Sequence, residues 1–319
     1  MAQARPFRFG VLVERFGTRE ELVGTARKAE EAGYATFLIR DHFIAEPFGH
    51  QFAPLTTLGT VAAVTERLRV GTLVFDNDYR HPAVLAKEAA TLDLLSGGRL
   101  ELGLGAGWAR EEYERAGIPF DPPGARVDRF AEALRVLKGL FADGPLSFSG
   151  RHYRIAGLDS FPKPVQRPHP PLLVGAGGRR MLRIAAREAD IVGVLTAPIA
   201  DGVLTDDPAT RLPESIAQKV EWVREAAGER FAALELSMVI SVVIAPDRRR
   251  AAEQFAARRD WRGVAAEEVL AMPSVFIGTV DQIAEEMHAR RERYGFSYLV
   301  VPDRSLDAVA PLVARLAGR

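Results

Sequence analysis

The chain has 319 residues, of which 47% are hydrophobic, so it can bury one large core. Its 42 Lys and Arg residues balance 42 Asp and Glu residues, so charge gives no reason to expect nucleic acid or an anionic membrane as a partner. The absence of cysteine excludes disulfides, thiolate nucleophiles and cysteine-bound iron–sulfur clusters. Residues 1–6 lack the apolar stretch of a secretory signal, and the apolar run 238–246 is too short to span a bilayer as a helix. We therefore expect a soluble, cytoplasmic protein.

Short β-rich runs alternate with helical stretches along the whole chain. The expected strands cover residues 7–13, 36–39, 68–75, 100–104, 171–174, 191–194, 234–244 and 297–301. The expected helices follow them at residues 18–33, 54–64, 82–92, 125–141, 179–188, 214–227, 247–272 (in two stretches), 279–295 and 306–316. Alternation predicts a parallel sheet, and eight units predict an α/β fold closed into a (β/α)8 TIM barrel, with an open doubly wound sheet as the alternative.

The alternation is interrupted twice. Residues 143–169 are rich in Gly and Pro and predict a small hairpin, 146–148 with 152–155, inserted between the fourth and fifth strands, followed by an extended connector. Residues 195–213 predict a long loop. Neither segment changes the overall composition, and no repeat is present, so we expect a single domain over residues 1–319.

In such a barrel, functional side chains lie on the loops that follow the carboxyl ends of the strands. This rule selects Glu14 after the first strand, and Asp41 and His42 after the second. After the fourth and fifth strands it selects glycine-rich loops that hold Gly105, Ala106, Gly107, Trp108, Gly175, Ala176, Gly177 and Gly178. The candidate site is therefore drawn from four separate loops.

The loop from Gly175 to Gly178 joins a strand to a helix that begins with Arg179 and Arg180. Glycines let backbone N–H groups approach an anion, and a helix N-terminus adds partial positive charge, so this loop predicts a phosphate site. An ordinary tight turn between strand and helix is the alternative. The loop is neither a complete dinucleotide-binding fingerprint nor a P-loop, because it lacks the last glycine of the first and the lysine of the second.

Gly103, Gly105 and Gly107 occupy every second position at the end of the fourth strand. This spacing suits a planar ligand lying against the backbone, and it equally suits a bend at the corner of a barrel. Trp108 follows directly and either covers that pocket or packs within the protein.

His42 lies just past the second strand, beside Asp41. An imidazole there can exchange a proton near neutral pH, or it can be a hydrogen-bonded structural histidine. The other five histidines form no cluster with metal-ligand spacing, so we expect no metal. A Gly-x-Ser-x-Gly elbow is also absent, which leaves a hydrolase triad without its nucleophile.

Several stretches together resemble a known family. They are Phe9-Gly10, Arg40-Asp41-His42-Phe43, the strand from Val70 to Val74, the run from Arg80 to Trp108, and the segment from Pro170 to Gly175. The chain resembles the luciferase-like monooxygenase superfamily over nearly its whole length, and within it the coenzyme F420-dependent oxidoreductases. The run from Arg80 to Trp108 is the most specific part of the match.

The resemblance implies a cofactor at the carboxyl ends of the strands, with its phosphate on the loop from Gly175 to Arg179. It implies a bulge near Leu73 and Val74, often with a non-prolyl cis peptide bond, behind the isoalloxazine-like ring. It places His42 beside the reactive carbon of the cofactor. Members that use flavin mononucleotide often carry Glu-His-His at this point, so Asp41-His42-Phe43 favours F420.

The chain departs from the sugar-phosphate and alcohol dehydrogenases of that branch at two positions. It has Glu46 where they have a tryptophan and Trp108 where they have a glutamate, so their substrates are not transferred to it. Glu14 lies near the position of an acid on their first strand.

We therefore predict an F420-dependent oxidoreductase that transfers a hydride between the deazaflavin and a small organic substrate. His42 is the first candidate for proton exchange and Glu14 the second. One alternative is an FMNH2-dependent monooxygenase that works with a separate flavin reductase. The other is a non-catalytic flavin-binding barrel. The resemblance also implies a homodimer.

Overall fold

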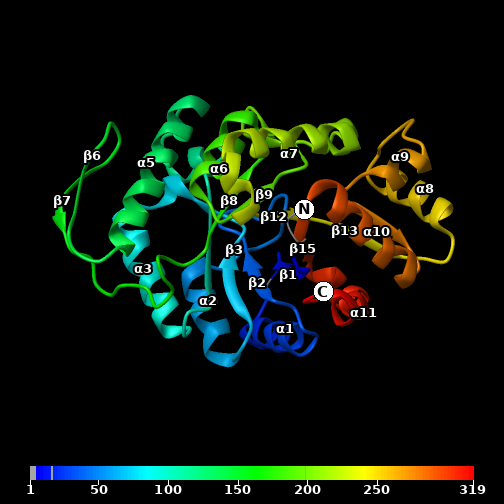
Figure 1. Ribbon diagram of the computed structural model, residues 1–319, viewed down its shortest axis with the longest axis horizontal. Helices are drawn as coiled ribbons and strands as arrows, with labels where there is room; N and C mark the ends of the chain where they lie inside the picture. The colour runs from blue at the N-terminus through cyan, green and yellow to red at the C-terminus, as the bar shows by residue number, and fades with distance from the viewer. Residues whose placement is uncertain (1–4, 16, 198) are drawn as a thin grey trace.

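Eight parallel strands form a closed barrel in the computed structural model, which describes residues 5–15, 17–197 and 199–319 (Figure 1). The barrel strands are β1 (Arg8–Val13), β2 (Thr36–Ile39), β3 (Arg69–Thr72), β5 (Leu100–Gly105), β8 (Leu172–Ala176), β9 (Ile191–Val194), β12 (Glu235–Val239) and β15 (Phe296–Pro302). They are hydrogen-bonded in the order β3-β2-β1-β15-β12-β9-β8-β5, and pairing of β3 with β5 closes the ring. The predicted TIM barrel is confirmed. The prediction that residues 1–6 are no secretory signal falls partly on residues 1–4, which lie outside the described residues.

Helices surround the barrel. They are α1 (Arg19–Glu31), α2 (Pro54–Val64), α3 (Pro82–Leu95), α5 (Pro123–Phe141), α6 (Arg179–Glu188), α7 (Pro213–Ala227), α10 (Val280–Tyr294) and α11 (Leu306–Leu316). Capping boxes at Thr18 and Thr279 begin α1 and α10, where they satisfy the first free N–H groups. Within the part of the chain that the structure describes, no helix is both long and apolar enough to cross a membrane.

The inserted hairpin is also confirmed. Strands β6 (Leu146–Ser149) and β7 (Arg154–Leu158) pair antiparallel between β5 and β8 and project beyond α5 in Figure 1. The loop predicted at residues 195–213 contains a second small hairpin, β10 (Ile199–Ala200) with β11 (Val203–Leu204), which the sequence did not predict.

The strand expected at residues 234–244 is wrong in its extent. After Val239 the chain leaves the barrel, and β13 (Ser241–Ile244) pairs instead with β14 (Val275–Gly278), a strand that we did not predict. Together with α8 (Arg248–Arg258) and α9 (Ala266–Ala271), this pair surrounds a core of its own. The apolar run was continuous because it supplies two different cores in succession.

The strand expected at residues 68–75 is interrupted as the resemblance implied. The Leu73–Val74 peptide bond is cis, and a short strand β4 (Phe75–Asp76) resumes pairing with β5. A further short helix, α4 (Arg110–Ala116), follows β5 and was not predicted. Both features lie at the carboxyl end of the barrel, where the candidate site is expected.

The interior of the barrel has an apolar layer and a charged layer. Leu12, Leu38, Leu173, Ile191, Tyr298 and Val300 form the apolar layer, on which Leu73 and Val74 pack. Glu101 lies toward the amino ends of the strands, where its side chain is only 1% exposed and accepts hydrogen bonds from Arg8 and Arg69. Burial alone would raise the pKa of Glu101, but the two guanidinium groups outweigh burial and lower it.

Candidate active site

Val74 forms the floor of the barrel mouth, directly after the cis peptide bond. Its side chain lies between the ends of β5 and β8. A Cβ atom on Gly105 would come within 2.8 Å of Val74 Cγ2, and one on Gly175 within 3.2 Å of Val74 Cγ1. These two glycines therefore make room for the bulged segment, a reason for their presence that the sequence did not indicate.

The other two glycines of β5 and its loop are also required by close packing. A Cβ on Gly103 would lie far closer than 3.0 Å to the carbonyl oxygen of Thr72. Gly107 has φ +76°, and a Cβ there would collide with the hydroxyl of Tyr113 and come within 2.7 Å of the Asp76 carboxylate. The alternate glycines thus bring the backbone of β5 against β3 and β4, in agreement with the interpretation of a bend.

The start of α6 has the features expected of an anion site. Gly178 is its N-cap and provides no side-chain hydrogen bond, so the first N–H groups of the helix have no capping side chain. A Cβ on Gly178 would meet nothing within 4 Å, which shows that the backbone there faces open space. Arg179 and Arg180 are exposed beside it. This arrangement fits a phosphate group.

His42 is held in one orientation by a buried carboxylate on α4. Its Nδ1 lies 3.0 Å from Glu112 Oε2, and the side chain of Glu112 is 1% exposed. Burial alone would raise the pKa of Glu112, but hydrogen bonds and charge from His42, Ile44 N–H and Tyr79 outweigh burial and lower it. An ionised carboxylate only accepts hydrogen bonds, so Nδ1 of His42 carries a proton. Nε2 has no hydrogen-bond partner among the described residues.

Glu112 also shapes the loop that carries His42. Its Oε1 accepts hydrogen bonds from the backbone N–H groups of Phe43 (2.8 Å) and Ile44 (3.1 Å), and its Oε2 accepts one from the Tyr79 hydroxyl (2.8 Å). One buried carboxylate therefore fixes both the ring of His42 and the backbone after it. The sequence analysis missed Glu112, because it lies 70 residues from His42 on a short helix without a capping signal.

Aromatic rings surround His42 on two sides. The ring of Phe48 lies 5.2 Å away, and Trp108 meets the imidazole edge-on at 5.5 Å. Arg40 in turn stacks on Phe48, with its guanidinium carbon 3.7 Å from the centre of the Phe48 ring. Trp108 therefore packs against His42 and Phe48 in the structure.

Glu14 is engaged in ion pairs. Its Oε1 accepts hydrogen bonds from Arg40 (2.7 Å and 3.1 Å), and its Oε2 accepts one from Arg304 (3.3 Å). Burial lowers the pKa of Arg40, while the charge of Glu14 raises it in part. Both oxygens of Glu14 have cationic partners in the structure.

Asp41 links the loop after β2 to Arg80 and to the short strand β4. It accepts hydrogen bonds from Arg80 (2.6 Å) and from the backbone N–H of Asp76 (3.2 Å). Asp76 is itself buried and accepts hydrogen bonds from the Tyr113 hydroxyl, and its burial together with the charges of Asp78 and Asp41 raises its pKa to about 7. In the described part of the chain, His and acidic residues form no group of three or more that could hold a metal ion.

Comparisons with known proteins agree with this architecture. An F420-dependent glucose-6-phosphate dehydrogenase of Nakamurella multipartita is 32% identical over 267 residues, which cover 82% of this chain and 74% of that protein. An FMNH(2)-dependent dimethylsulfone monooxygenase of Pseudomonas putida is 33% identical over 167 residues, 52% of this chain and 46% of that protein. The structure of the F420-dependent tetrahydromethanopterin reductase of Methanopyrus kandleri matches with a TM-score of 0.74 at 19% identity, over 96% of this chain and 97% of that one, which is a likeness of fold.

The fold and these relatives define the chain as an α/β-barrel oxidoreductase. The model of the luciferase-like monooxygenase family matches residues 6–313, and the chain belongs to this family.

Proposed function

We propose that the chain is an F420-dependent oxidoreductase that acts on a small organic molecule bound over the deazaflavin. The observation that carries the proposal is the orientation of His42, whose Nδ1 is fixed by Glu112 while Nε2 has no hydrogen-bond partner in the described part of the chain. The names of relatives that share most of the chain support F420.

The cofactor would occupy the mouth of the barrel. Leu73 and Val74 would lie behind its ring, with Asp41 and the segment Gly105, Ala106, Gly107 and Trp108 at its edges. Its phosphate would lie on Gly175, Ala176, Gly177, Gly178 and Arg179. Support comes from the uncapped start of α6, which leaves N–H groups available to an anion, and from the half-exposed side chains of Leu73 and Val74.

When bound, the deazaflavin supplies or accepts the hydride, which carries both electrons of the reaction. The chain moves the accompanying proton. In reduction of a carbonyl, Nε2 of His42 donates a proton to the developing alkoxide, and in oxidation of an alcohol it accepts that proton. Glu112 stabilises the charged imidazole that holds the second proton. Phe48 and Trp108 exclude water from the ring of His42.

Glu14 would act on the substrate only after leaving its ion pairs with Arg40 and Arg304. We therefore propose that Glu14 mainly keeps Arg40 in place over Phe48. This gives His42 the chief part in proton transfer.

The test is a titration of the protein with F420, FMN and riboflavin, followed by optical spectroscopy. We expect F420 to bind most tightly and to be oxidised or reduced when a suitable substrate is added. Binding of FMN without binding of F420 would reject the proposal. Failure of both cofactors to turn over with any substrate, together with an unaltered affinity in His42→Ala, would favour a non-catalytic barrel.

The second candidate is an FMNH2-dependent monooxygenase supplied by a separate flavin reductase, as the name of the Pseudomonas putida relative indicates for that protein. Its distinguishing measurement is oxygen uptake that depends on reduced FMN. Under either function we propose a cytoplasmic homodimer; light scattering of the purified protein tests the dimer, and fractionation of cells tests the location.

A further inference from the structure

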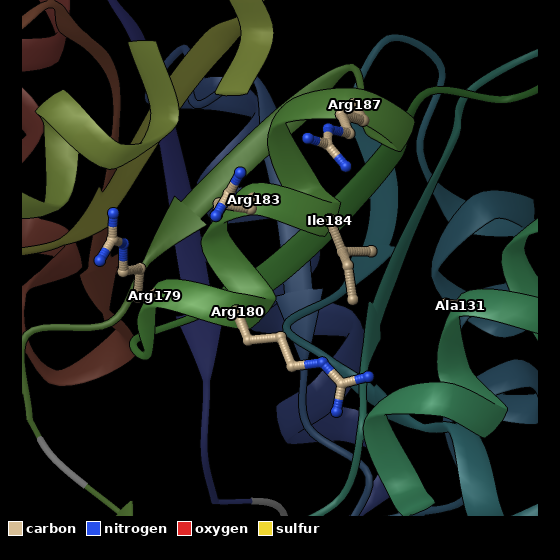
Figure 2. Close-up of a pocket in the computed structure, with 6 residues that line it drawn as sticks. All are labelled: Ala131, Arg179, Arg180, Arg183, Ile184 and Arg187. Carbon is tan, nitrogen blue, oxygen red and sulfur yellow. The ribbon is translucent and has the colours of Figure 1, made fainter. Parts of the chain in front are cut away.

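Four arginines follow one another along the outer face of α6. Arg179, Arg180, Arg183 and Arg187, here called the α6 arginine stripe, line a groove of about 710 Å³ together with Ala131 of α5 and Ile184 (Figure 2). At 3.6 residues per turn, these positions fall on one side of the helix. The groove is therefore basic along its whole length and has an apolar base.

Most of this charge is not neutralised by the protein. Arg180 forms an ion pair with Asp128 on α5, and Figure 2 shows it reaching toward that helix. Arg183 and Arg187 are exposed and have no ion pair within the described residues. Arginines at positions i and i+4 of a helix repel each other, so the stripe weakens α6 unless an anion lies beside it.

The other arginine-rich segments of the chain contain both paired and unpaired arginines. Arg248, Arg249, Arg259 and Arg290 each have a carboxylate partner in the structure. Arg250 and Arg258 of α8, by comparison, are exposed and have no ion pair within the described residues. The stripe is distinguished by its place, because its unpaired arginines line one groove that begins at the uncapped start of α6.

The stripe begins where the phosphate of the cofactor would lie. Arg179 opens α6 directly after Gly178, and α6 then runs from the mouth of the barrel down its flank. From Arg179 to Arg187 the helix rises about 12 Å. A group attached beyond the phosphate would therefore leave the mouth along the groove.

We propose that the α6 arginine stripe binds a polyanionic tail of the cofactor, a chain of carboxylates attached beyond its phosphate. The inference rests on the proposed F420 function, because coenzyme F420 carries an oligoglutamate tail beyond its phosphate whereas FMN ends at the phosphate. Guanidinium groups pair with carboxylates through two hydrogen bonds, so arginine suits such a tail. Each γ-linked glutamate spans more than the ~3.6 Å of an ordinary residue, so a few units reach Arg187.

The test measures affinity and needs no substrate. Deazaflavin forms with the phosphate but no glutamate, and with several glutamates, are titrated by fluorescence into the wild-type protein and into R183Q/R187Q. The matched control is R250Q/R258Q, which removes two exposed arginines from α8 that have no ion pair within the described residues. Circular dichroism verifies that both variants are folded.

We expect the long-tailed form to bind the wild type about three- to tenfold more tightly than the tail-less form at low salt, and less so at high salt. This advantage should disappear in R183Q/R187Q and persist in R250Q/R258Q, while the tail-less form binds all three proteins equally. Equal binding of both forms by the wild type would overturn the inference and leave the proposed function intact. If neither form binds, both the proposed function and the inference are overturned.

Discussion

Replacing Glu112 by Gln should reverse the tautomer of His42. The amide oxygen of Gln can keep the two backbone hydrogen bonds from Phe43 and Ile44, but its NH2 group then faces Nδ1 of His42 and the hydroxyl of Tyr79, which both donate to Glu112 in the wild type. Nδ1 must then accept a hydrogen bond, so the proton moves to Nε2 and the ring can no longer take up a proton there. We expect kcat to fall about 10²- to 10⁴-fold and the free energy of unfolding to fall by about 1–3 kcal/mol.

The ring nitrogens of His42 provide the decisive measurement. The chain has 6 histidines, few enough to assign by ¹⁵N NMR with His42→Ala as the reference. A proton that stays on Nδ1 in Glu112→Gln would refute the reasoning. A double-mutant cycle tests whether Glu112 acts through His42, because Glu112→Gln should then lower kcat no further in the His42→Ala background.

Three other substitutions test the close packing and the buried carboxylates of the barrel. Gly107→Ala places a Cβ at φ +76° against the Tyr113 hydroxyl, and we expect a loss of about 1–3 kcal/mol of unfolding free energy in urea denaturation. Glu101→Gln leaves Arg69 without a carboxylate partner among the described residues, while Arg8 keeps Glu235, and it should cost about 3–5 kcal/mol. Since the pKa of Glu101 is lowered, its contribution is present above the ordinary carboxyl pKa and is lost as the pH falls through the lowered value. The pKa of Asp76 is raised to about 7, so its contribution to stability is full below the ordinary value of 3.8 and is lost as the pH rises through about 7; Asp76→Asn should flatten the pH dependence of unfolding across that window.

The barrel could be predicted from the sequence because each of its units carries a local signal. Thr18 and Thr279, for example, begin helices by capping boxes that operate within four residues. The pairing of β13 with β14 could not be predicted in this way. The apolar run that contains β12 and β13 is continuous, and only contacts with residues about thirty positions later decide where the barrel strand ends.

The residues of the candidate site also fall into those that local sequence signals predict and those that only contacts between distant residues reveal. His42 and the loop at Gly178 follow strand ends, so their positions follow from the order of the elements. Glu112 and Arg40 became recognisable only in the structure, because their roles depend on contacts across the barrel mouth, with His42 in one case and with Glu14 and Phe48 in the other. A glutamate on a short polar helix has no feature in the sequence that separates it from a solvated surface residue.

Two buried carboxylates at opposite ends of the barrel allow stability and chemistry to be separated. Glu101 lies at the amino ends of the strands between Arg8 and Arg69, and Glu112 lies at the carboxyl ends beside His42, yet both side chains are 1% exposed. Glu101→Gln should lower the free energy of unfolding and leave kcat, measured per folded molecule well below the unfolding temperature, unchanged. Glu112→Gln should lower kcat far more than its effect on stability explains. If both variants lose kcat in proportion to their loss of stability, Glu112 supports only the fold and the proposed role of His42 in proton transfer loses its structural basis.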